Sequence, residues 1–102
     1  LCQDSQALGL IDGKNGAPLR LVQEQRQEEC GQALQMSAYQ QGHAQGIAQY
    51  CTPAQGKWDG ERGIVYRQNC PSALEPAYLE GYRPAILYYQ LVHKTPEIAD
   101  IK

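Results

Sequence analysis

The residues best suited to do chemistry are the cysteines. The chain of 102 residues contains four of them, at Cys2, Cys30, Cys51 and Cys70. An even number of widely spaced cysteines in a chain of this length is typical of a disulfide framework. A metal site would need ligands at closer spacing, yet there is no CxxC pair, and neither histidine lies at ligand spacing from a cysteine. We therefore expect two disulfides, no metal ion and an oxidising compartment.

The cysteine spacing favours one of the three possible pairings. The midpoint between Cys2 and Cys30 falls at Gly16, an expected turn, so an antiparallel hairpin would bring these two cysteines together. The midpoint between the other two falls near Gly60, in a glycine-rich stretch. Sequential pairing needs no further assumption about the fold. The sequence predicts the disulfides Cys2–Cys30 and Cys51–Cys70.

No set of residues predicts catalysis. The serines fit helix caps or turns, and neither histidine lies in a nucleophile motif. Asp12 and Asp59 each precede a glycine, which is first of all a turn signal. Disulfide-bonded cysteines are not nucleophiles. We expect a protein that is not an enzyme and that holds no cofactor.

The best candidate for a binding residue is Trp58, the single tryptophan. It lies in a polar, glycine-rich stretch, and exposed aromatic side chains in such places are often binding anchors. An aromatic groove for glycan or peptide, made of the seven tyrosines together with Trp58, is the alternative. We expect the tyrosines to form the core instead, because the chain has no Phe. The candidate binding residues are Trp58, Asp59, Glu61, Arg62 and His43.

Helix signals divide the chain into a few short elements. Caps, glycines and prolines bound four expected helices, over about 4–13, 18–31, 37–51 and 72–95. Residues 53–63 are expected to form a glycine-rich loop. For 64–67, a helical turn and a short strand both remain open, and a small hairpin over 64–70 is the main alternative to a loop.

Glycines recur beside aromatic residues along the chain. Gly42 and Gly46 lie one turn apart in an expected helix, where each glycine is unfavourable by about 1 kcal/mol, so close approach of another backbone is their expected role. An aromatic residue also precedes a glycine by two or three positions at Tyr39–Gly42, Trp58–Gly60 and Tyr78–Gly81. This weak repeat is too short and irregular to predict a solenoid.

Together these signals predict an all-α fold, an irregular bundle of about four short helices stapled by two disulfides. One domain is expected over 1–95, followed by a C-terminal tail over 96–102. The formal net charge of −2 does not suit nucleic acid, which requires clustered basic residues. No apolar run approaches the roughly 18 residues of a membrane span.

Two longer runs resemble a known family. The first is Gly9-Leu-Ile-Asp12-Gly13-Lys-Asn-Gly16 followed by Cys30. The second runs from Tyr39-x-x-Gly42-x-x-x-Gly46 through Cys51 to Gly60-x-x-Gly63-x-x-Tyr66-x-x-x-Cys70. This ordered spacing, over roughly 2–84, resembles domain-of-unknown-function family 2799. The resemblance implies a small bacterial cell-envelope protein, often a lipoprotein. In that family arginine commonly follows the central glycine, whereas His43 and Glu61 stand at those positions here.

These observations favour a non-enzymatic interaction module of the bacterial envelope. Its expected partner is another envelope or periplasmic protein. An inhibitor or immunity protein against a periplasmic enzyme or toxin is one alternative. A binder of small ligands or cell-wall glycan is the other. The expected location is periplasmic or associated with the outer membrane, and a lipid anchor upstream of this chain is compatible with it.

Overall fold

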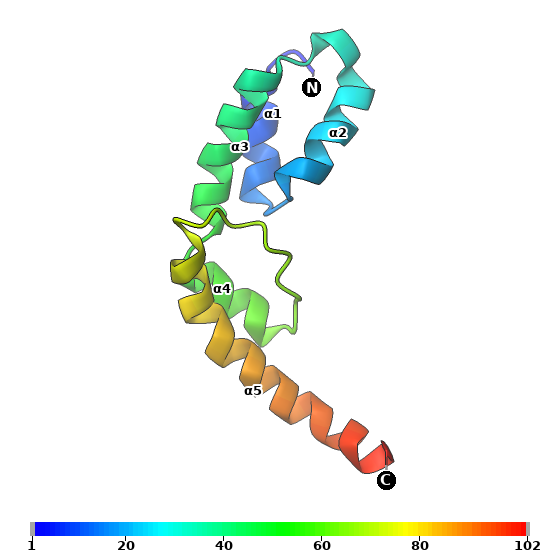
Figure 1. Cartoon of the computed structure of the whole chain (residues 1–102), viewed down its shortest axis with the longest axis vertical. Coiled ribbons are helices and arrows are strands. Elements are labelled where there is room, and N and C mark those ends of the chain that lie inside the picture. The colour runs from blue at the N-terminus through cyan, green and yellow to red at the C-terminus, as the bar shows by residue number, and fades with distance from the viewer. Residues whose placement is uncertain (1, 102) are drawn as a thin grey trace. The chain divides into compact units, whose positions relative to one another are not determined.

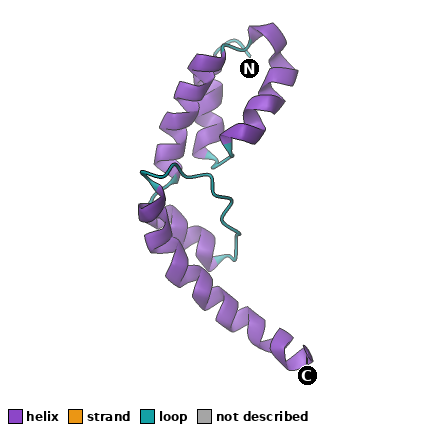
Figure 2. Ribbon diagram, viewed as in Figure 1, coloured by secondary structure: helices purple, strands orange, loops and turns teal. Residues whose placement is uncertain are grey.

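The computed structural model describes residues 2–101, with side chains described as far as His93. Within this part the chain consists of helices and loops, with no strand (Figure 2). The elements are α1 (Ser5–Lys14), α2 (Leu19–Cys30), the short 3-10 helix η1 (Gly31–Ala33), α3 (Met36–Tyr50), α4 (Pro53–Glu61) and α5 (Glu75–Ile101) (Figure 1). The all-α prediction is confirmed. The tail predicted for 96–102 lies outside the described side chains.

The loop predicted for 53–63 is wrong, because α4 covers most of it. Its start is well capped: the Thr52 hydroxyl accepts a hydrogen bond from the backbone N–H of Gln55 at 3.2 Å, and Pro53 occupies the first helical turn. Two glycines weaken the helix locally, but packing against α5 outweighs their low propensity. The segment 62–74 that follows is irregular, and neither the turn of helix nor the strand considered for 64–67 is present.

Contacts divide the chain into two compact units, where the sequence predicts a single domain. The first unit comprises Leu1–Tyr50 with Arg67–Pro71, and the second comprises Cys51–Tyr66 with Ser72–Lys102. Each is built on a pair of packed helices, α1 with α3 in the first unit and α4 with α5 in the second. We call these pairs the first and second hairpin.

Both predicted disulfides are confirmed. Cys2 is bonded to Cys30, with their Cα atoms 5.5 Å apart, and Cys51 is bonded to Cys70. Disulfides of this kind are typical of an exported protein in an oxidising compartment. Within the described residues, no helix is both long enough and apolar enough to cross a membrane.

Helices α1 and α3 pack backbone against backbone. A Cβ atom added at Gly9 would clash with the Tyr39 carbonyl, and one at Gly42 would clash with the Gln6 carbonyl. The close approach predicted from the glycine spacing is therefore confirmed. Beside this contact lies a small apolar core. It is formed by Leu8, Leu34 and Tyr39 together with the partly buried Leu19, Val22, Cys30 and Met36.

The second hairpin repeats this contact. Gly56 lies against the Tyr78 carbonyl, and Gly81 lies against the Pro53 carbonyl. Instead of a helix like α2, the irregular segment supplies Tyr66, whose ring stacks on Tyr78 with centroids 5.1 Å apart. The expectation that tyrosines form the core holds for Tyr78 and Tyr82, which are buried, but it is wrong for Tyr88, which is 71% exposed.

The two hairpins match position by position. The motif Gly-x-x-Asp-Gly-x-x-Gly occurs at 9–16 in the first and at 56–63 in the second. Its last glycine has a positive φ in both, 75° at Gly16 and 71° at Gly63, a conformation that favours glycine. In both, a tyrosine ring from the second helix packs on that glycine, Tyr50 on the first and Tyr89 on the second. The repeating unit is therefore a whole hairpin.

Candidate interaction surface on helix α4

The aspartate of the repeated motif is a buried anchor in the first hairpin. The Asp12 carboxylate accepts hydrogen bonds from the Tyr39 hydroxyl at 2.6 Å and from Arg26 Nε and Nη2 at 2.9 and 2.8 Å. Burial alone would raise the pKa of Asp12, but the bonds from Arg26 and Tyr39 outweigh burial and lower it below its usual value. Asp12 is thus held as a carboxylate that joins α1, α2 and α3.

Asp59 occupies the matching position in the second hairpin and is only 2% exposed. Its carboxylate accepts hydrogen bonds from the Tyr78 hydroxyl at 2.6 Å and from Gln55 Nε2 at 3.0 Å. A binding role was predicted for Asp59 from the sequence. Its side chain instead points into the unit, where it holds α4 against α5.

His43 is also buried, although it was a candidate binding residue. Its Nε2 atom lies 2.6 Å from the Ala17 carbonyl oxygen, just after the first motif. At the matching position in the second hairpin, the Tyr82 hydroxyl donates to the Ile64 carbonyl at 2.7 Å. The two side chains therefore fix equivalent loops, and His43 is not available to a partner at the surface.

The other three candidates are exposed and lie close together at the end of α4: Trp58 and Glu61 within the helix, and Arg62 at its C-cap. The Trp58 side chain is 49% exposed. The Arg62 guanidinium lies over its ring, 3.7 Å from the centroid, and Arg62 Nη1 donates to the Trp58 carbonyl at 2.8 Å. This pairing holds a large aromatic surface and a cation in one fixed arrangement.

Charges of both signs flank Trp58. Glu61 lies 3.8 Å from the Lys57 ammonium and 3.8 Å from the Arg62 guanidinium. A shallow hollow on the same helix is lined by Thr52, Ala54, Gln55 and Trp58. We call Trp58, Glu61, Arg62, Lys57 and this hollow the α4 surface. Such a mixed, aromatic surface suits a protein partner better than a polyanion.

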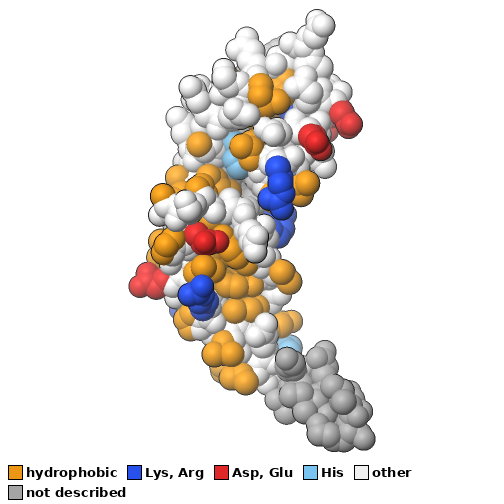
Figure 3. Space-filling model, in the orientation of Figure 1, with side chains coloured by type: hydrophobic (Ala, Val, Ile, Leu, Met, Phe, Trp, Pro, Cys, Tyr) orange, Lys and Arg blue, Asp and Glu red, His pale blue; other side chains and the backbone are white. Residues whose placement is uncertain are grey.

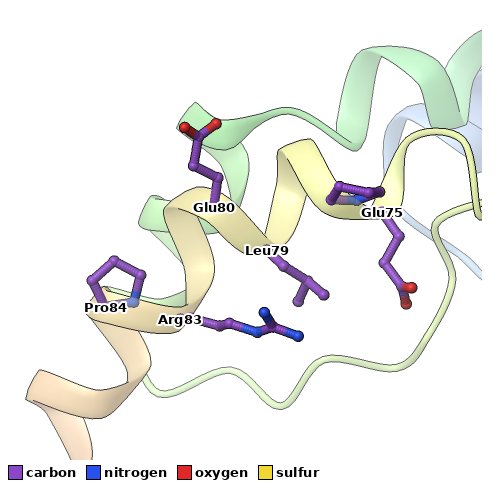
Figure 4. Close-up of a pocket in the computed structure, with 6 residues that line it drawn as sticks. Glu75, Leu79, Glu80, Arg83 and Pro84 are labelled. Carbon is purple, nitrogen blue, oxygen red and sulfur yellow. The ribbon is translucent and has the colours of Figure 1, made fainter.

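A second hollow lies on α5, and none of its residues was among those predicted from the sequence to bind a partner. Figure 4 shows Glu75, Leu79, Glu80, Arg83 and Pro84 around it, with the two glutamates pointing in different directions. Glu75 is already engaged, since the Tyr66 hydroxyl donates to its Oε2 at 2.8 Å. In the sequence, Leu79, Arg83 and Leu87 recur every four residues, which places them on one side of a helix. This spacing was the signal that could have pointed to a surface there.

Within the described chain, no three His, Cys, Asp or Glu side chains are placed so that they could hold a metal ion. Each buried side-chain nitrogen or oxygen there has a hydrogen-bond partner. The buried aspartates and tyrosines are thus explained by the packing of the hairpins.

Comparison with known protein families gives a match. The model of a family described as "Protein of unknown function (DUF2799)" matches residues 4–86. This range includes both hairpin motifs. No curated protein and no solved structure matches the chain.

Proposed function

The chain belongs to the DUF2799 family, and we propose that it is a protein-interaction module that contacts its partner through the α4 surface. The proposal rests chiefly on Trp58. The Trp58 side chain is about half exposed, and the Arg62 guanidinium is held over its ring. Tryptophan and arginine are the residues most enriched at binding hot spots.

The structure around Trp58 supports a role in recognition more than a role in folding. Each buried member of the repeated motif has a structural task, but Trp58 corresponds to Ile11 in the first hairpin, which is 50% exposed. The repeated architecture therefore does not require a tryptophan at this position.

We propose an envelope protein as the partner. The two disulfides indicate an oxidising, exported environment, and the family resemblance implies the bacterial envelope. The charge of the chain is mild, and the α4 surface offers Lys57 and Arg62 beside Glu61, so a partner with complementary polar groups around an apolar socket fits it.

The test is affinity capture from a bacterial envelope extract with the oxidised chain as bait. We expect one partner near a one-to-one ratio, and we expect Trp58→Ala to weaken its binding by about tenfold or more. Ile11→Ala is the matched control, since that side chain has the same exposure and the equivalent position in the first hairpin. Circular dichroism should show unchanged helix content in both variants.

Two outcomes would contradict the proposal. One is a folded Trp58→Ala variant that binds the captured partner as tightly as the native chain. The other is no captured protein combined with a saturable change in the fluorescence of Trp58, the single tryptophan, on titration with cell-wall glycan fragments. The second result would instead assign the α4 surface to a glycan.

A further inference from the structure

Helix α5 carries two apolar stripes. The first faces α4 and contains the buried Tyr78 and Tyr82. The second follows the spacing i, i+3, i+4, i+7, i+8 that normally marks a buried helix face. We call it the α5 stripe, and it consists of Pro84, Leu87, Tyr88, Leu91 and Val92. The last four are 56%, 71%, 62% and 49% exposed, in that order.

The first hairpin shows that the fold does not need this stripe. The positions of α3 that match Pro84, Leu87 and Tyr88 are Gln45, Ala48 and Gln49, and all three are exposed.

The surroundings of the stripe form a surface that another helix could occupy. Beside Pro84 and Tyr88 lies a groove between α4 and α5, whose rim carries Lys57, Glu61 and Glu80. Figure 3 shows apolar side chains gathered over this part of the chain up to the residues drawn in grey. No Asp, Glu, Lys or Arg occurs from Pro84 to His93, so the stripe itself is uncharged.

We propose that the α5 stripe is the interface of a homodimer in which two copies of the chain pair their α5 helices antiparallel. An uncharged stripe can face a copy of itself without burying a charge. The antiparallel arrangement also keeps the two copies of Arg83, and of Glu80, at opposite ends of the interface. A two-fold dimer of this kind is the commonest symmetric assembly.

The area of the stripe places the dimer in the class of weak, transient interfaces. An aromatic side chain buries 150–250 Å², so Tyr88 contributes about 150 Å² and the four exposed side chains roughly 450 Å² per copy. This is well below the about 800 Å² per partner of a standard stable interface. The dimer is therefore weak and dissociates on dilution.

The test is sedimentation equilibrium of the full oxidised chain from about 5 to about 500 μM, a range suited to a weak interface. The weight-average mass should rise from that of a monomer towards twice that value. The double variant Leu87→Lys, Leu91→Lys should remain monomeric throughout, because its charges would be buried in the interface. Leu21→Lys is the matched control, since that leucine on α2 is 53% exposed, and it should still associate.

The outcomes separate this proposal from the one for the α4 surface. Trp58→Ala should leave the association unchanged, and the double lysine variant should keep its captured partner. A monomeric native chain at every concentration would overturn the proposal, as would a double lysine variant that still dimerises. If the monomeric chain instead sedimented with phosphatidylglycerol vesicles, the stripe would be assigned to a lipid surface.

Discussion

The two hairpins use one internal plan with different coverings. In both, a buried aspartate accepts a hydrogen bond from a tyrosine hydroxyl at 2.6 Å, and glycines bring two helix backbones together. The first hairpin is covered by α2, whose Arg26 also binds Asp12. The second is covered by the irregular residues that directly follow α4, which place Tyr66 on Tyr78 and Tyr82.

This comparison distinguishes what the hairpin requires from what can vary. The aspartate, the tyrosine and the close glycines recur because each fills a place defined by two crossing helices. The covering can be a helix or a loop, since either can shield the tyrosine ring from water. The exposed positions differ most, with Trp58 and the α5 stripe present only in the second hairpin.

The largest expected effect comes from blocking the helix crossing. Gly42→Ala would drive its Cβ into the Gln6 carbonyl, and Gly81→Ala would do the same at Pro53. We expect each to lower the free energy of unfolding by about 3 kcal/mol or more, because backbone atoms cannot move aside as a flexible side chain can. Urea denaturation followed by circular dichroism measures this.

Gly31→Ala is the control for that experiment. Its added Cβ would meet nothing within 4 Å, and only its positive φ of 56° makes alanine unfavourable. Because its ψ is −130°, this residue lies outside the left-handed helical region, and we expect alanine there to cost about 1–3 kcal/mol. If Gly42→Ala or Gly81→Ala cost no more than this control, the crossing in that unit would not depend on close backbone contact.

A smaller effect is expected from the tyrosine hydroxyls. Tyr39→Phe removes one donor from Asp12, and Tyr78→Phe removes one from Asp59. Each should lower the free energy of unfolding by about 1–3 kcal/mol, the usual cost of a buried polar group that loses a partner. Thermal and urea unfolding of both variants would show whether the two bonds are equivalent. If only one of the two variants lost stability, the two hydrogen bonds would not be equivalent.

The smallest effect concerns pH. The pKa of Asp12 is lower in the folded chain than its usual value of 3.8, so its stabilising contribution is present above that value and is lost as the pH falls through the folded pKa. The free energy of unfolding should therefore fall below about pH 4, by at most about 1.4 kcal/mol per pH unit for this one proton.

Asp12→Asn tests this origin of the pH dependence. The variant should be less stable than the native chain at pH 7, and the difference should shrink as the pH falls towards 2. Urea denaturation at a series of pH values measures both curves. Parallel curves for the native chain and the variant would mean that Asp12 does not contribute to the acid sensitivity.

Several features were predictable because they depend on residues near one another in the sequence or on simple spacing. The disulfide pairs follow from cysteines placed evenly about expected turns. The close approach at Gly42 follows from two glycines on one helix face. The hairpin repeat is also visible in the sequence, as Gly-x-x-Asp-Gly-x-x-Gly at 9–16 and 56–63. The prediction considered only the shorter pattern of an aromatic residue followed by a glycine, and so it missed this longer motif.

Other features could not be predicted because they depend on contacts between distant residues. Gly56 and Gly60 argue against a helix locally, and α4 forms because both glycines pack against the backbone or side chains of α5. Asp59 precedes a glycine and resembles a turn residue, yet the Tyr78 hydroxyl, 19 positions along the chain, makes it a buried anchor.

The sequence by itself therefore determined the helical class and the covalent framework, because helix periodicity and capping act locally and the cysteine spacing favours one pairing. Only the tertiary structure decided which polar residues are buried and which remain at the surface. The reason is that burial is set by what packs on a side chain. His43 and Asp59 are enclosed by neighbouring elements, whereas Trp58 and the α5 stripe remain exposed.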